Sequence, residues 1–284
     1  MVKIVADSTC DLSKELVERY HITILPLHIV LGDQEFRDGV DITPDEIYAW
    51  SDANKTTPKT SAPSVEDTID AIKPHLDQGN EVIVFGISEQ MSTCCNVIRM
   101  VVQSMDAEDR VTVVDSQNLS TGIGLLVIEA AIMAEEGHTR EEIISWIEQL
   151  RPLVRASFVV DTLVYLHRGG RCSGIAALAG SMLRLHPEIV VKNGAMGPSK
   201  KYRGKLDSVI TTSARDLEAD LLKARPDRVF ITHSGCNPVT VDKVRQYLLS
   251  LNYFEEILET RAGGVVSSHC GPGTLGVLFI AQED

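Results

Sequence analysis

Residues 81–102 read EVIVFGISEQMSTCCNVIRMVV, and this stretch indicates the fold class. A run rich in Val and Ile, Glu81–Gly86, comes first, a polar segment follows it, and an apolar stretch of helical length continues through Val102. A strand, a polar turn and a helix in this order are typical of a βαβ unit, because parallel strands need a long crossover that is most often helical. The stretch therefore predicts an α/β fold with a mostly parallel sheet.

The same pattern occurs elsewhere in the first half of the chain. Residues 2–6 and Val111–Asp115 predict two more strands, each followed by a polar or glycine-bearing turn and a helix. Residues 27–37, with Gly32 and Asp33 at their centre, predict an inserted β-hairpin. The second half predicts strands at 188–192, 228–233, 255–259 and 275–281, and helices at 206–224 and 239–249.

A break near Pro152 indicates the domain organisation. Proline disfavours continuation of the helix that ends at residues 149–152, and a β-like run at 157–160 follows at once. A chain of 284 residues exceeds what one hydrophobic core usually supports. We therefore predict two α/β domains with a cleft between them: residues 1–155, with the hairpin and a mostly parallel sheet, and residues 156–284, with a mixed sheet.

Composition and charge limit the function classes. The formal net charge is -13, and hydrophobic residues make up 44% of the chain. Nucleic-acid binding is not expected, because it depends on cations that replace the counterions of phosphates. No apolar run reaches the roughly 18 residues of a membrane span, so stable membrane insertion is not expected. The N-terminus becomes acidic at Asp7, too early for a secretory signal, and we predict a cytoplasmic protein that is a monomer.

The cysteines have no spacing that suggests a metal site or a disulfide framework. No C-x-x-C pair is present, and no histidine is spaced with the thiols in the manner of zinc ligands. We therefore predict buried free thiols and no metal. The cysteines are Cys10, Cys94, Cys95, Cys172, Cys236 and Cys270.

Two hydroxyl-rich segments are candidates for holding a small acidic ligand. In KTSAPS at 59–64, Ser64 suits a helix N-cap, which leaves Thr60 and Ser61 for a ligand or for a structural role with equal weight. The segment SEQMSTC at 88–94 precedes a helix, and backbone N–H groups at a helix start favour a negative group. Helix capping alone would also explain this second segment.

Further polar segments follow along the chain. DSQNLSTG at 115–122 also opens a helix, and capping is the preferred interpretation there. Residues 161–171 predict a short helix closed by two glycines, with Arg171 beyond them. Arg203 lies in the basic run KKYRGK at 200–205, which suits either a solvated turn or contact with an acidic partner.

His269 precedes the sequence GPG at 271–273, a turn that lets backbone approach a ligand closely, so we interpret His269 as functional. One alternative is a serine-dependent acyl hydrolase that uses Ser92 and His269 with an acid such as Asp161. It is the weaker hypothesis, because the chain has no G-x-S-x-G elbow. A hydroxyl network that only joins two domains is the other alternative.

Several motifs in one order resemble the DegV family of fatty-acid-binding proteins, over nearly the whole chain. A set of this kind is more specific than any single motif in it. The motifs are DSTCDL at 7–12, KTSAPS at 59–64, Asp115-Ser116 with GIG at 122–124, residues 163–171 ending in RGGR, and HCGPG at 269–273.

The resemblance implies a lipid site between or beneath two domains, which enclose a long acyl chain. Carried over to this chain, the residues that would meet the fatty-acid carboxyl group are Thr60 or Ser61, Ser92 and His269. The resemblance further implies a lipid carrier rather than an enzyme, with no cofactor apart from the bound fatty acid.

The resemblance also implies a partner, because carriers of this type present the fatty acid to a separate kinase subunit that forms an acyl phosphate. Arg171 and Arg203 match basic positions that would dock this kinase or stabilise the phosphoryl group. One departure concerns the family's L-S-G-T element, which appears here as MSTC at 91–94. Either the backbone at Thr93 does not need a positive φ, or the loop takes another path.

Overall fold

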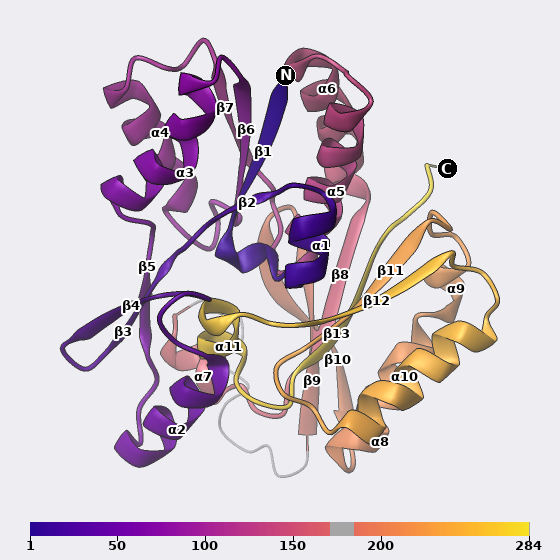
Figure 1. Ribbon diagram of the computed structural model, residues 1–284. Helices are drawn as coiled ribbons and strands as arrows, with labels where there is room; N and C mark the ends of the chain where they lie inside the picture. The colour runs from indigo at the N-terminus through magenta and orange to yellow at the C-terminus, as the bar shows by residue number, and fades with distance from the viewer. Residues whose placement is uncertain (171–184, 284) are drawn as a thin grey trace.

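The computed structural model describes residues 1–170 and 185–283, and β-sheets of four, three and six strands organise them (Figure 1). The four-stranded sheet has the order β2-β1-β6-β7, and all of its strands are parallel. The predicted strands in this half of the chain are confirmed, and β2 is an additional one. The strands are β1 (Val2–Asp7), β2 (Thr23–Leu25), β6 (Glu81–Gly86) and β7 (Val111–Asp115).

Helices cover both faces of the parallel sheet, because successive side chains of a strand point to opposite faces. Val82 and Val84 pack with α3 and α4, whereas Ile83 and Phe85 pack with α5, and all of these side chains are fully buried. The elements of this layer are η1 (Ser8–Cys10), α1 (Lys14–Arg19), α3 (Val65–Asp77), α4 (Cys94–Ser104), α5 (Thr121–Glu135) and α6 (Arg140–Leu150).

A small antiparallel sheet, β4-β3-β5, projects beside the parallel one (Figure 1). The predicted hairpin is confirmed: β3 (His28–Leu31) pairs with β4 (Gln34–Arg37), and Gly32 has a φ of 64° in the turn. The third strand, β5 (Lys59–Ser61), pairs with β3 and was not predicted. Helix α2 (Pro44–Asn54) connects β4 to β5.

The six-stranded sheet is mixed, as predicted for the second half of the chain. Its order is β10-β9-β8-β13-β11-β12, and only β11 and β12 are parallel neighbours. The helix predicted at 206–224 is divided into two at Leu217. The elements are β8 (Val154–Val159), β9 (Leu185–Lys192), β10 (Ala195–Arg203), α8 (Leu206–Asp216), α9 (Glu218–Leu221), β11 (Arg228–His233), α10 (Pro238–Ser250), β12 (Glu256–Arg261) and β13 (Leu275–Ile280).

One hydrophobic cluster joins the parallel and mixed sheets through α5. Ile4 and Ile83 of the parallel sheet belong to the same cluster as Phe230 and Leu278 of the mixed sheet. The expected boundary between residues 155 and 156 falls inside β8, which follows η2 (Arg151–Leu153) and pairs in the mixed sheet from its first residue. The division into two domains stays a prediction.

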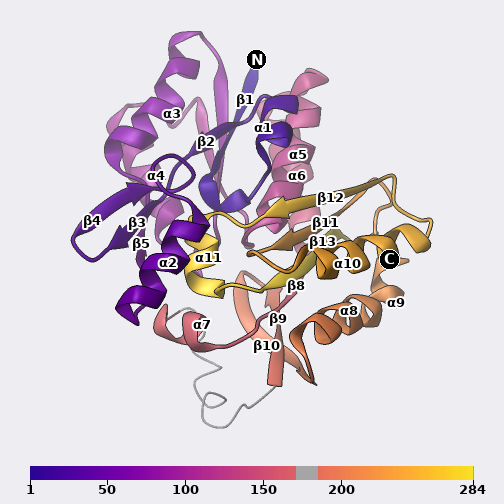
Figure 2. The same ribbon diagram turned by 60° about the horizontal axis from the view of Figure 1, so that its bottom comes forward.

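Two short helices, α7 (Val164–Arg168) and α11 (Gly264–Cys270), lie next to each other, and α11 lies against the small sheet (Figure 2). Helix α11 packs against α2, α7, β3 and β5, and it was not predicted, because its sequence GVVSSHC gives no clear helical signal. No helix in the described ranges is long and apolar enough to cross a membrane.

Candidate functional site

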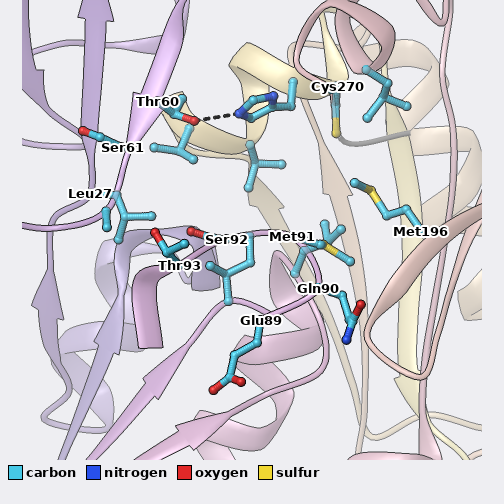
Figure 3. Close-up of a pocket in the computed structure, with 18 of the residues that line it drawn as sticks. Leu27, Thr60, Ser61, Glu89, Gln90, Met91, Ser92, Thr93, Met196 and Cys270 are labelled. Carbon is cyan, nitrogen blue, oxygen red and sulfur yellow. Dashed lines mark hydrogen bonds between the residues drawn. The ribbon is translucent and has the colours of Figure 1, made fainter. Parts of the chain in front are cut away.

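A cavity of about 480 Å³ lies where β5, α11, α7, the start of β10 and the loop after β6 meet (Figure 3). Segments from both halves of the chain therefore form its walls. Its lining combines hydroxyl and imidazole groups with many apolar side chains. The apolar lining residues are Leu27, Ala62, Ile87, Met91, Leu119, Leu166, Ala195, Met196, Val265 and Val266.

Thr60 and His269 are joined in this cavity by a hydrogen bond of 2.8 Å between Thr60 Oγ1 and His269 Nε2 (Figure 3). Thr60 reaches the histidine because it lies beside the fully buried Ile29 in the register of β5 and β3. Ser61 comes next in the strand, is exposed, and points away from this pair (Figure 3). Of the two hydroxyls that the sequence left open, the structure brings only Thr60 to His269.

His269 lies in the last turn of α11, and two glycines surround it. Gly169, just after α7, packs against its imidazole so closely that a Cβ atom there would collide with the ring. Gly271 has a φ of 75°, and a Cβ atom on it would meet the ring of Tyr165. The close approach of α7 to α11 thus depends on these glycines.

Ser92 lies on the opposite wall, in the loop between β6 and α4. Its Oγ accepts a hydrogen bond of 3.2 Å from Cys94 N, and the buried Ser88 donates one of 2.7 Å to Gly194 O, which ties this loop to the β9–β10 turn. Thr93 has a φ of -87°, so the backbone does not need the positive φ that a glycine would provide. The first of the two alternatives for this position is therefore the one observed.

The third polar segment contains one error of prediction. Ser120, at the N-cap of α5, makes no side-chain capping bond and has a φ of 54°. Its hydroxyl instead donates to a carboxylate oxygen of Asp11, more than a hundred residues away in the sequence. Local spacing favoured capping, whereas a tertiary contact decides the orientation of this side chain. By contrast, the N-cap predicted at Ser64 is confirmed.

Three buried aspartates near the cavity were missed as a group by sequence reasoning. Asp7, Asp11 and Asp38 are 0%, 5% and 2% exposed, and burial raises the pKa of each carboxyl group. No Lys, Arg or His within residues 1–170 and 185–283 forms an ion pair with them. The motif DSTCDL contained two of them but gave no sign of their depth.

Of the two predicted arginines, Arg203 is described, and it does not line this cavity. Arg203 is exposed at the end of β10, where it pairs with Leu185 of β9. Arg171 lies outside the described residues, as does Cys172. The other cysteines are buried and free, as predicted, and burial raises the pKa of Cys95 and Cys236 to about 12. In the described part of the chain, no group of three His, Cys, Asp or Glu side chains is arranged to hold a metal ion.

Comparison with known proteins places the chain in a family. The family model described as "Uncharacterised protein, DegV family" matches residues 1–282. A DegV domain-containing protein of Deinococcus radiodurans is 30% identical over 276 residues, which cover 97% of each chain. Solved structures agree: a fatty-acid-binding DegV family protein from Thermus thermophilus has a TM-score of 0.89 and 31% identity, covering 99% of both chains.

A stearic acid-binding protein from Eubacterium ventriosum has a TM-score of 0.84 and 30% identity, and the match covers 99% of this chain and 98% of that one. The structural neighbours are thus DegV proteins that bind fatty acids. The whole-length match of the family model and these relatives lead to one conclusion: the chain belongs to the DegV family.

Proposed function

We propose that this protein binds one long-chain fatty acid in the cavity of about 480 Å³, with the carboxyl group beside Thr60, Ser92 and His269. The observation that carries the proposal is the composition of the cavity wall, where a bonded Thr60–His269 pair and further polar side chains face ten apolar ones. Its volume lies within the range of about 300–1,000 Å³ that is typical of small-molecule sites. DegV relatives that bind fatty acids support the same ligand class.

The acyl tail would supply most of the affinity. Burial of one methylene contributes about 0.8 kcal/mol, so a chain of roughly sixteen carbons contributes at most about 12 kcal/mol before ordering costs. A smaller apolar cavity of about 30 Å³ lies next to the main one and shares Leu119, Val266 and Cys270 with it. We propose that the tail extends in this direction.

The carboxyl group needs hydrogen bonds, because an unpartnered buried carboxylate costs several kcal/mol. The Thr60 hydroxyl can accept from the imidazole and donate to a carboxylate oxygen at the same time. His269 lies in the last turn of α11, where the helix dipole favours a cationic side chain, and an imidazolium suits an anionic ligand. Ser92 would donate a further bond from the opposite wall.

Native mass spectrometry of the purified protein, followed by solvent extraction, tests the proposed function. We expect about one fatty acid per chain, and we expect His269→Ala and Ser92→Ala to retain less of it than wild type. His167→Ala, which removes an exposed histidine of α7, is the matched control. Unchanged retention in both site variants would remove these residues from the site. Release of acid from supplied acyl esters would instead favour the hydrolase, which the relatives do not favour.

We further propose that the protein presents the bound acid to a separate kinase and that it is not itself catalytic. The exposed side chains of Glu89, Gln90 and Thr93 in the cavity lining support this, because they leave a mouth for a partner to approach. Arg203 would contact that partner from the end of β10. Acyl phosphate formed with ATP and a kinase subunit can be trapped as a hydroxamate. Equal yields from wild type and Arg203→Ala would exclude a role for this arginine.

A cytoplasmic location and a monomeric state complete the proposal. The net charge of -13 supports the monomer, since like-charged copies repel one another. Light scattering coupled to size-exclusion chromatography measures the oligomeric state, and a mass of two chains would contradict the monomer.

A further inference from the structure

We infer that Asp7, Asp11 and Asp38 form a buried frame that positions the residues of the candidate carboxyl site, Ser92 and His269. None of the three aspartates lines the cavity, so they are positioning residues rather than ligand contacts. The inference rests on the proposed function for its meaning in lipid binding, but the geometry of the frame can be tested without a lipid.

The first part of the frame holds the start of α11. Gly263 N donates to Asp11 Oδ1 at 2.7 Å, Gly264 N donates to Asp38 Oδ1 at 2.7 Å, and Val265 N donates to Asp38 Oδ2 at 3.2 Å. The first N–H groups of a helix have no partner within it, and Gly263 at the N-cap makes no side-chain capping bond. Two carboxylates from the N-terminal part of the chain therefore provide the acceptors.

His269 follows Gly264 by five residues, which places it about 7.5 Å along the helix axis. Because α11 is short and its start is held by hydrogen bonds, a shift of that start is carried to the imidazole. Close packing leaves little freedom there: a Cβ atom on Gly264 would lie 2.8 Å from Asp38 Oδ1 and 2.6 Å from Ile29 Cδ1. The position of the imidazole thus depends on Asp38.

The second part of the frame holds the wall that carries Ser92. Asp7 Oδ2 accepts hydrogen bonds from Ile87 N at 2.7 Å and from Cys94 Sγ at 3.3 Å, at the two ends of the loop that contains Ser92. Asp7 lies at the end of β1, next to β6 in the parallel sheet. The loop is therefore fixed to the sheet from both ends by one carboxyl group.

The first part of the frame also holds two other walls of the cavity. Asp11, which binds Gly263, also accepts from Ser120, whose neighbour Leu119 lines the cavity. Ser8 Oγ donates to Asp38 Oδ2 at 2.9 Å and accepts from Leu27 N at 3.1 Å, and Leu27 lines the cavity as well. Each aspartate thus connects an N-terminal segment to a different wall.

Burial of the three carboxyl groups is unfavourable for stability, so a role in stability alone does not explain why they are there. Three carboxyl groups are buried near one another, and burial followed by mutual repulsion raises the pKa of Asp11 well above its usual value. Apolar residues at such positions often stabilise a protein better than buried ionisable groups do. Departures of this kind are expected where a site needs a fixed geometry, and hydrogen bonds from backbone N–H groups to these carboxyl oxygens provide it.

The test compares Asp38→Asn with Asp41→Asn, a matched control in the same loop whose exposed carboxylate bonds to Arg37. Asparagine at 38 keeps one acceptor oxygen and replaces the other with an NH2 donor, which then faces the N–H group of Gly264 or Val265, so we expect the helix start to move. In delipidated protein we expect a shifted ¹H–¹⁵N imidazole signal of His269. With oleate labelled with ¹³C at the carboxyl carbon, we expect roughly tenfold weaker binding, the equivalent of one lost hydrogen bond. Asp41→Asn should match wild type in both.

Wild-type imidazole signals and wild-type oleate affinity in Asp38→Asn would overturn the inference. A wild type that does not bind oleate would contradict the proposed function, while the imidazole signal of the lipid-free protein still decides whether the frame exists. Ser8→Ala is a milder second variant, for use if Asp38→Asn does not fold, because it removes one donor to Asp38 and leaves the carboxylate. A smaller imidazole shift is expected there, and none at all would again overturn the inference.

Discussion

The inward and outward faces of the small sheet and its adjoining loop use similar residues for different purposes. On the outward side, His28 bonds to Glu35 at 2.7 Å and to Asp67 at 2.8 Å, and the exposed Asp41 bonds to Arg37. On the inward side, Asp38 bonds to the start of α11, more than two hundred residues away in the sequence.

The outward pair of Asp41 and Arg37 is local and solvated, and pairs of that kind typically contribute about 0–1 kcal/mol each. The inward groups connect distant segments and define a cavity wall. The comparison shows that residue type alone does not determine the role of a polar side chain. A polar side chain on the outward side contributes to stability, whereas one on the inward side helps to form the candidate site.

The largest effect is expected from a substitution that disrupts the packing of α11 on the inward side of the small sheet. Gly264→Ala adds a methyl group against Asp38, Ile29 and Ile47. We expect the free energy of unfolding to fall by about 2–3 kcal/mol, the usual cost of overpacking, and fatty-acid retention to fall with it. Chemical denaturation measures the first and native mass spectrometry the second. Gly197→Ala, where a Cβ atom meets nothing within 4 Å, is the control. Equal stability of the two variants would show that α11 tolerates displacement.

A smaller effect is expected from substitutions of the two neighbouring hydroxyl residues of β5. Thr60→Val removes the hydroxyl that bonds to His269 and keeps the shape of the side chain, whereas Ser61→Ala removes the neighbouring outward hydroxyl. We expect oleate binding to weaken about tenfold in Thr60→Val, since a neutral to charge-assisted bond is worth about 1–1.5 kcal/mol, and to stay unchanged in Ser61→Ala. Isothermal titration calorimetry measures both. Equal losses of oleate affinity in the two variants would mean that the alternating direction of side chains along β5 does not determine which hydroxyl contacts the ligand.

The smallest effects lie in the pH dependence of stability, where the two faces have opposite signs. Hydrogen bonds from Arg37 lower the pKa of Asp41 from 3.8 to about 2, so its contribution is present above about pH 4 and is lost as pH falls toward 2. Burial raises the pKa of Asp38, so its contribution is present at low pH and is lost as pH rises from 3.8 through the raised value.

Urea unfolding between about pH 2.5 and 7 should therefore distinguish these carboxyl groups. Asp41→Asn is expected to flatten the acid limb of the stability curve, and Asp38→Asn to reduce the decline toward neutral pH. If both variants changed the same limb, the assignment of opposite faces would be wrong.

The predictions from the sequence were correct where the structure depends on local sequence patterns. The strands at Glu81–Gly86 and Val111–Asp115, the hairpin around Gly32 and the N-cap at Ser64 follow from apolar periodicity, turn residues and cap spacing, all of which act within a few residues. The family and the mixed sheet of the second half were also predicted correctly.

Part of the candidate site could not be predicted in this way. The sequence named Thr60, Ser61, Ser92 and His269 as candidates, and all four line one cavity, where only Thr60 bonds to His269. It could not separate Thr60 from Ser61, because β5 is too short to show an alternation of its own and takes its register from β3. For the segment at 115–122 capping was the preferred interpretation, whereas Ser120 at the start of α5 contacts a carboxylate that lies far away in the sequence.

The sequence by itself determined most of the strands and helices, the family, and the residue types available for a carboxyl site. Only the tertiary structure decided which hydroxyl meets His269, that residues 264–270 form a helix, and that three aspartates are buried behind the cavity. The physical reason is the range of the forces: backbone preference and periodic burial act between near neighbours, whereas the hydrogen bonds of Asp7, Asp11 and Asp38 form only after segments 80 to 252 residues apart have packed together.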